Sequence, residues 1–150
     1  MTERPSKPVV LAWARLMKAQ RVALARVEAA LKRAGLPPLA WYDVLLELER
    51  AGEAGLRPFE LERALLLAQY NLSRLIDRIE REGLVERAPC LQDGRGQIVR
   101  VSPRGRSMRR AMWPIYAQAI DAAVGSHLDN NEAERLSALL GRIVDVADQL

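Results

Sequence analysis

The sequence contains only one cysteine, Cys90, and only one histidine, His127, among its 150 residues. A lone cysteine cannot form an intrachain disulfide, and these two residues alone cannot supply an ordinary Cys/His zinc site. No Ser/His/Asp arrangement is possible without His127, and no glycine-rich phosphate loop is present. We therefore predict no metal, no cofactor and no enzyme, and the cysteine count fits a reducing compartment.

Long hydrophobic runs are also missing. No stretch approaches the ~20 apolar residues of a membrane span, and Arg15 interrupts the apolar run at 9–14 before it has the length of a signal peptide. A content of 49% hydrophobic and 28% charged residues is typical of a globular chain. We expect one soluble, cytoplasmic domain with no membrane partner.

Positive charge is concentrated in the middle of the chain. Residues 71–110 carry 10 basic and 5 acidic side chains, whereas residues 111–150 carry 2 basic and 6 acidic ones. A basic cluster favours a polyanion because each neutralised phosphate releases condensed counterions. A solvated arginine-rich face would have the same composition, so a motif is needed to decide.

Hydrophobic periodicity predicts a mainly helical chain. The apolar spacing and the Gly/Pro breaks predict helices from about Pro8 to residue 34 and over 39–50, 58–66, 103–126 and 131–150. Ser102 and Asn131 are the expected caps of the last two helices. The first helix and the last two carry more apolar surface than the middle of the chain can cover, which suggests burial against a second copy.

The segment from Gln69 to Glu82 predicts an amphipathic helix with one face packed and one face free. Its core-facing stripe is Leu72, Leu75, Ile76 and Ile79, and its free polar side chains are Asn71, Ser73, Arg74, Asp77, Arg78 and Arg81.

A basic hairpin follows this helix. Gly83 closes the helix, and alternating residues at 84–87 and 97–101 predict two strands joined through Asp93-Gly94-Arg95. A polar helix face followed directly by an arginine-tipped ribbon is typical of a winged helix-turn-helix DNA reader.

The chain resembles the MarR family of bacterial transcriptional regulators. The resemblance covers the whole chain in architecture and residues 60–105 in motif. It is carried by Glu60-Leu61, the run LSRLIDRIEREGLVER at 72–87, Asp93-Gly94-Arg95 and Ser102-Pro103-Arg104-Gly105.

This resemblance implies a mainly α fold with a small β wing. Residues 39–104 then form the winged helix-turn-helix part, and residues 1–35 and 105–150 form dimerisation helices, all within one domain spanning 1–150. The implied function is a homodimeric repressor on a pseudo-palindromic, double-stranded operator, relieved by a small-molecule effector or an oxidant.

The resemblance also implies roles for individual residues. Arg95 matches the wing arginine that enters the minor groove, and Asp93 matches the acid that braces the wing. To these we add Arg78, on the polar helix face, and Arg104, as a phosphate contact. The positions that meet bases and phosphates at the start of the recognition helix are Gln69, Tyr70, Asn71, Ser73 and Arg74.

Some positions depart from the family pattern. Leu66 stands where a small residue is usual, and Ala68 stands where serine or threonine commonly caps the helix, so the helix start is open. Gln69 and Asn71 suit either pairing with adenine or an ordinary cap or surface role. Asp77 is expected to pair with Arg78 or Arg81 on the helix surface.

The lone cysteine and the lone histidine each have a plain structural role to set against a functional one. Cys90 is either an oxidant sensor or an ordinary thiol, and His127 is expected at a cap or on the surface. Only Arg87 and Arg95 lie near enough in sequence to lower the pKa of the Cys90 thiol, so the ordinary role is preferred.

The aromatic residues are expected to belong mostly to the core, and an effector pocket could borrow one of them. Those concerned are Trp13, Trp41, Trp113 and Tyr116. The competing function for the whole chain is a helical protein–protein interaction module, which would not need an arginine-tipped hairpin.

Overall fold

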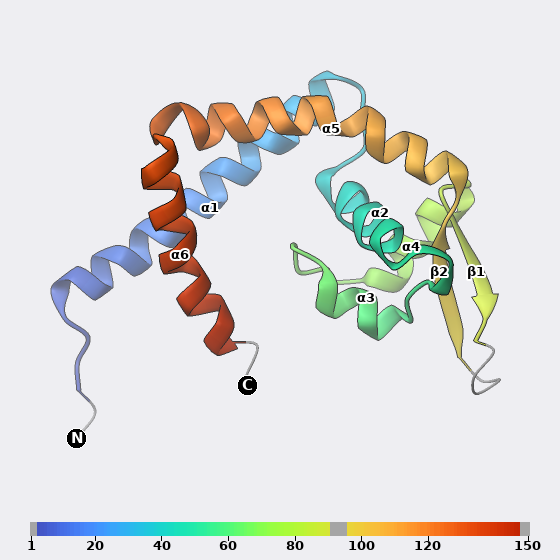
Figure 1. The fold of residues 1–150 in the computed structure, drawn as a ribbon, viewed down its shortest axis with the longest axis horizontal. Coiled ribbons are helices and arrows are strands. Elements are labelled where there is room, and N and C mark those ends of the chain that lie inside the picture. Colours follow the sequence, from blue (N-terminus) through green and yellow to red (C-terminus); the bar gives the residue numbers. More distant parts are fainter. Residues whose placement is uncertain (1–2, 91–95, 148–150) are drawn as a thin grey trace. The chain divides into compact units, whose positions relative to one another are not determined.

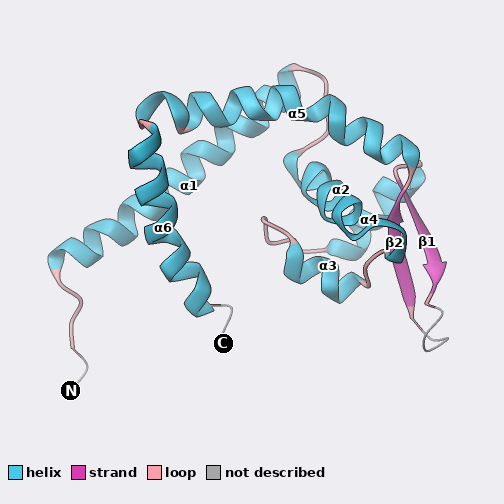
Figure 2. Cartoon of the chain, in the orientation of Figure 1, coloured by secondary structure: helices cyan, strands magenta, loops and turns pink. Residues whose placement is uncertain are grey.

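The computed structural model describes residues 3–90 and 96–147. These residues are mostly helical, with one two-stranded sheet, as Figures 1 and 2 show. The predicted fold class is confirmed. The elements in chain order are α1 (Lys7–Arg33), α2 (Leu39–Ala51), η1 (Gly52–Ala54), α3 (Pro58–Ala64), α4 (Leu72–Arg81), β1 (Val85–Pro89), β2 (Gln97–Val101), α5 (Pro103–Ala123), η2 (Gly125–His127) and α6 (Asn130–Ala147).

The chain divides into two compact units, which we describe separately. The terminal unit combines Met1–Val27 with Ala117–Leu150, and the central unit comprises Glu28–Tyr116. Helices α1 and α5 each contribute residues to both units. Every residue predicted to contact DNA belongs to the central unit.

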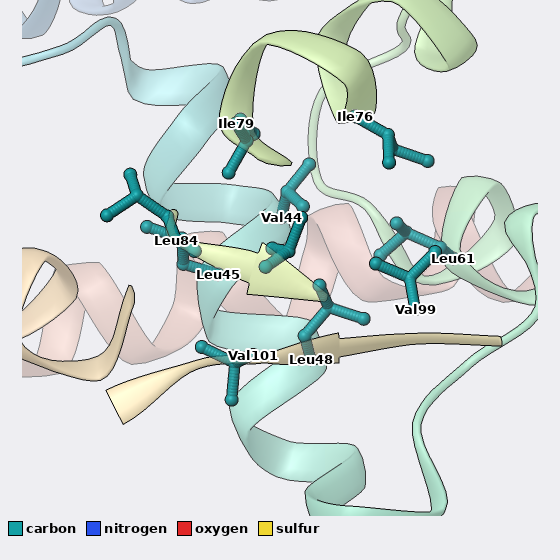
Figure 3. Packing of buried hydrophobic residues seen from close by; sticks show 10 residues of the cluster. Val44, Leu45, Leu48, Leu61, Ile76, Ile79, Leu84, Val99 and Val101 are labelled. Atoms are coloured by element: carbon teal, nitrogen blue, oxygen red, sulfur yellow. The ribbon is translucent and has the colours of Figure 1, made fainter. Parts of the chain in front are cut away.

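The core of the central unit lies between α2, α3, α4 and the sheet. Figure 3 shows Leu45 and Leu48 of α2 beside Val101 and Leu84, with Ile79 of α4 above them. Fully burying one such side chain contributes about 1.5–3 kcal/mol relative to leaving it exposed. The predicted apolar stripe of the fourth helix is confirmed, since Ile76 and Ile79 are almost fully buried and Leu72 and Leu75 pack against the cluster.

The two strands form an antiparallel hairpin whose register pairs Val85 with Val101 and Pro89 with Gln97. A third segment joins it, because Leu56 and Val99 exchange two backbone hydrogen bonds of 3.0 and 2.8 Å. Gly55 makes this approach possible: a Cβ there would lie 2.6 Å from the Val99 carbonyl oxygen. The start of α3 is thereby fixed to the base of the wing.

The corner between α4, β1 and α5 is held by small residues. Gly83 ends the recognition helix with a φ of +75°, a backbone conformation that residues other than glycine rarely adopt. The Ser102 hydroxyl donates to the Gly83 carbonyl at 2.6 Å and accepts the Gly105 amide at 3.0 Å, which confirms Ser102 as the cap of α5. Gly105 packs so closely that a Cβ would collide with the Leu84 carbonyl oxygen.

Within the central unit, α5 is attached to α2 by aromatic and ionic contacts. Tyr42 contacts Trp113 and Tyr116 at ring-centroid distances of 6.2 and 4.9 Å, and Arg109 forms an ion pair with Glu49. Burial, followed by the nearby charges of Tyr42 and Asp43, raises the pKa of Tyr116. The core prediction is wrong for Trp113, which is 46% exposed because only part of its ring meets this cluster.

In the terminal unit, apolar side chains line faces that the described chain leaves uncovered. Trp13 is 64% exposed, so the expectation that it lies in the core of its own chain is wrong. The helical spacing of α1 is present and its end is buried at Val27 and Leu31, but no described segment covers Trp13 or Met17 on the same face. The large exposed apolar residues are Val9, Val10, Leu11, Trp13, Met17 and Val22 on α1, and Leu136, Leu139, Ile143 and Val144 on α6.

The capping box of α6 lies two residues earlier than the sequence predicts. Asp129, not Asn131, accepts the Glu132 amide at 2.8 Å, and the Glu132 carboxylate accepts the Asp129 amide at 3.1 Å. The reason is that the Asp129/Glu132 pair also has the three-residue spacing of a capping box, with a carboxylate as the cap. Among the described helices, none has the length and apolar character needed to cross a membrane.

Candidate nucleic-acid interface

The recognition helix α4 begins at Leu72, later than the helical pattern from Gln69 indicates. Asn71 is its cap: the side-chain oxygen accepts the Arg74 amide at 3.1 Å. Of the two interpretations open for Asn71, the structure places the residue as a cap. Gln69 and Tyr70 therefore lie in the turn before the helix, and the cap that Ala68 cannot provide is provided at residue 71.

The polar face of α4 is exposed along the helix. Ser73, Arg74, Arg78 and Arg81 are all exposed, while Ile76 and Ile79 on the opposite face are buried. The serine hydroxyl donates or accepts, and the guanidinium groups donate to phosphates or to guanine edges.

One hollow brings together most of the residues predicted at the helix start. Its volume is about 500 Å³ and it is open to solvent. Of the residues that line it, Tyr70 is fully exposed and Phe59 is 56% exposed. Apolar groups on such a surface can contact the thymine methyl group. The hollow is lined by Pro58, Phe59, Glu62, Gln69, Tyr70, Asn71, Leu72 and Ser73.

The base of the wing is bonded to the recognition helix through Arg87. Its guanidinium donates to Asp77 at 2.6 Å and to Glu80 at 2.9 Å, and the hydrogen bond to Asp77 is the main cause that raises the pKa of Arg87. The predicted pairing of Asp77 with Arg78 or Arg81 is therefore wrong. The reason is that Gly83 turns β1 back beside α4, which places Arg87 against both carboxylates, whereas Arg81 reaches only the Asp77 carbonyl.

Arg104 lies apart from the other predicted contacts. It is exposed in the first turn of α5, and its side chain lies over Gly83 at the carboxyl end of α4. Residues 71–74 are at the opposite end of that helix, about 15 Å away at 1.5 Å per residue. The phosphate-contact role of Arg104 stays a prediction.

The predicted wing-tip residues Asp93 and Arg95 lie outside the described residues. The strands that carry the tip are described, and they present Gln97 and Pro89 as the last paired residues. The minor-groove role of Arg95 and the bracing role of Asp93 stay predictions.

Cys90 follows β1 directly and is buried, with 8% of its surface exposed. The Arg57 guanidinium donates to its sulfur at 3.2 Å. A hollow beside it is lined by parts of η1, α3 and both strands. This burial favours a structural role for the thiol over oxidant sensing, since redox-sensor cysteines are usually accessible.

A buried polar residue that the sequence analysis missed is Asp43. It is buried in α2, 6% exposed, and its two carboxylate oxygens accept the amides of Leu66 and Leu67 at 3.1 and 2.8 Å. The available signal was an acidic residue inside an otherwise apolar helix face, between Tyr42 and Val44. A buried carboxylate needs partners, and those partners were not visible in the pattern.

Proteins of known function have sequences similar to this chain. The chain is 30% identical over 123 residues to the transcriptional activatory protein BadR of Rhodopseudomonas palustris, covering 81% of this chain and 67% of the relative. It is 28% identical over 105 residues to the multiple antibiotic resistance protein MarR of Escherichia coli, covering 70% and 72%.

A solved structure has the same fold. The crystal structure of a MarR family transcriptional regulator from Streptomyces coelicolor, in complex with DNA, superposes with a TM-score of 0.82 at 25% identity, covering 95% of this chain and 89% of that one. The sequence model described as MarR family matches residues 34–96, which hold α2, α3, α4 and β1. This chain belongs to the MarR family.

Proposed function

We propose that the protein is a homodimeric transcriptional regulator that binds double-stranded DNA in a sequence-specific manner. The observation that carries this proposal is the exposed polar face of α4, capped at Asn71 and tied to an antiparallel wing through Arg87. A helix presented in this way fits the major groove, and the adjoining ribbon reaches the neighbouring groove. The Streptomyces relative crystallised with DNA supports the same use of this fold.

Within this function we assign roles to the predicted contacts. Ser73, Arg74 and Arg78 lie in the major groove and meet bases and phosphates, with Gln69 and Tyr70 beside them in the preceding turn. Asn71 contributes mainly by capping the helix. We assign Arg95, braced by Asp93, to the flanking minor groove. We assign Arg104 to the phosphate backbone.

The terminal helices are assigned to dimerisation. A stripe that includes Trp13 and Met17 on α1, and another that includes Leu139 and Ile143 on α6, would leave a monomer with extensive exposed apolar surface. A second copy covers such stripes by two-fold symmetry and places two recognition helices on one duplex. Residues 1–35 and 105–150 then dimerise, and residues 39–104 read DNA.

We further propose repression relieved by a small-molecule effector, in the cytoplasm and without catalytic activity. Activation is the second candidate, because the relative with 30% identity is named a transcriptional activatory protein. A reporter gene downstream of the operator separates the two: deletion of the regulator raises expression under repression and lowers it under activation.

The DNA-binding proposal is tested by selecting ligands from a random duplex pool with the purified protein. We expect recovery of a pseudo-palindromic sequence that binds about 10³-fold or more tightly than unrelated duplex, as specific regulators do. Recovery of no common sequence, with equal binding to all duplexes, would contradict sequence-specific regulation and favour a protein–protein interaction module.

A further inference from the structure

The turn between α3 and α4 makes few backbone contacts of its own. It spans residues 65–71, and among the described residues no backbone-to-backbone hydrogen bond is donated by residues 66–71. Leu66 projects outward with 75% of its surface exposed, and Ala68 has no side chain that can cap a helix. The position of this turn must therefore come from another part of the unit.

Leu65 at the start of the turn packs against the core, and the Asp43 carboxylate holds the residues that follow it. Its two oxygens accept two consecutive amides, those of Leu66 and Leu67, so both hydrogen bonds are charge-assisted and directional. Asp43 is buried, and the neighbouring Val44 is fully buried in the core. The carboxylate cannot shift without moving the core side chains beside it.

We propose that Asp43 is a positioning residue for DNA recognition, which fixes the turn at residues 65–71 on α2 and thereby sets where α4 begins. This inference rests on the proposed function. The capped end of α4 follows four residues after the bonded amides, at Asn71, so a movement of the turn moves Ser73 and Arg74 directly. Base contacts tolerate little displacement, because a bidentate contact depends on hydrogen-bond geometry.

Helix α2 can fix the position of the turn because α2 is itself attached to α5 within the central unit. Tyr42 contacts Tyr116, and Glu49 pairs with Arg109. The turn, α2 and this part of α5 are thus linked by consecutive contacts from one helix. The recognition helix takes its position from α2 through Asp43, and its own cap at Asn71 completes only the first turn.

The inference is tested with Asp43→Asn, which keeps the side-chain volume but replaces one acceptor by an NH₂ group facing an amide donor. We expect its affinity for the selected operator to fall about tenfold or more, and its affinity for unrelated duplex to change less than about threefold, since phosphate contacts are less demanding in geometry. Glu47→Gln is the matched control, because that partly buried carboxylate on the same helix pairs with Arg50 and not with the turn. It should bind as the wild type does.

Hydrogen exchange on the unmodified protein provides a measurement that does not depend on a variant folding. The Leu66 and Leu67 amides should exchange more slowly than that of Tyr70, and Asp43→Asn should accelerate exchange at both while core amides of Leu45 and Ile79 keep their protection. Fast exchange at both amides in the wild type would overturn the inference, whatever the variant does.

The outcomes also separate this inference from the proposed function. If wild-type protein shows no operator preference, the proposed function fails. If wild type discriminates and a folded Asp43→Asn dimer discriminates equally well, the function stands and the positioning role of Asp43 is wrong. A uniform loss of affinity for all duplexes would likewise contradict it, because a positioning defect affects base readout first.

Discussion

The side-chain amide of Asn71 could either cap α4 or pair with adenine, and its observed hydrogen bond favours the cap. The oxygen that would pair with adenine already accepts the Arg74 amide. Bidentate pairing with adenine needs both the oxygen and the NH₂ group, so capping removes half of that capacity.

The cap can be tested by substitution. Asn71→Ala should lower the free energy of unfolding by about 1 kcal/mol, and Asn71→Ser should retain most of it because serine also caps helices. Thermal melts measure the stability, and operator binding is measured on the same samples. An Asn71→Ser protein with wild-type stability but lost operator preference would show that the amide reads a base.

Arg95 carries the prediction for the wing tip. Arg95→Ala should weaken operator binding about tenfold, or ~1.4 kcal/mol, since narrow minor grooves attract arginine. Arg50→Ala removes the same charge from the end of α2, where Arg50 pairs with Glu47 at the surface, and should have little effect. Fluorescence anisotropy with one operator duplex compares them. Equal binding by folded Arg95→Ala and wild-type dimers would leave α4 as the sole reader.

The sequence predicted that a charged residue would have a partner more reliably than it predicted which residue that partner is. The sequence indicates that Asp77 has a cationic partner, but local spacing favours Arg78 or Arg81, whereas the chain reversal at Gly83 brings Arg87 to it. Asp43 was missed for the same reason. Its partners lie 23 and 24 positions away, and no periodicity reports contacts at that separation.

At the scale of elements, most of the fold was predictable. The strand at 97–101 and the helix starts at residues 39, 58 and 103 agree with the structure, because proline and glycine breaks and the serine cap act locally. The helix starts at Leu72 and Asn130 differed from the expected ones, because neighbouring polar residues compete for each cap. Asn71 and Asp129 occupy those cap positions.

A substitution at Gly105 tests how closely α5 packs against the Leu84 backbone just before β1. Gly105→Ala should destabilise the protein by about 1–3 kcal/mol, because the added Cβ meets the Leu84 backbone, which cannot rotate away. Gly141→Ala is the control within α6: it has open space and should be neutral or stabilising by about 0.5–1 kcal/mol. Denaturant melts give both values. Equal stability of the two variants would contradict this tight contact.

At the scale of the whole molecule, the exposed stripes of α1 and α6 imply assembly. Sequence periodicity placed apolar residues on one side of these helices, but the structure leaves Trp13 and Met17 of α1 and Leu139 and Ile143 of α6 exposed in a single chain. Periodicity identifies a face that needs burial, and it does not say whether the covering surface belongs to the same chain.

Trp13→Glu should therefore shift the protein from dimer to monomer, because an unpaired carboxylate would have to be buried in an apolar interface. Ala29→Glu introduces the same charge at an exposed position on the opposite side of α1 and should remain dimeric. Sedimentation at micromolar concentration distinguishes about 16.8 kDa from twice that mass. A dimer of unchanged stability in Trp13→Glu would place the interface elsewhere.

The most direct test of the account is the dependence of binding on half-site spacing. Two recognition helices related by two-fold symmetry require half-site centres about 10–10.5 base pairs apart, on one face of the duplex. Anisotropy titrations should compare the selected operator with a duplex whose half-sites are separated by about five additional base pairs, or half a helical turn. We predict that this insertion reduces affinity to the level of unrelated DNA. Unchanged affinity for the lengthened duplex would contradict recognition by a symmetric dimer.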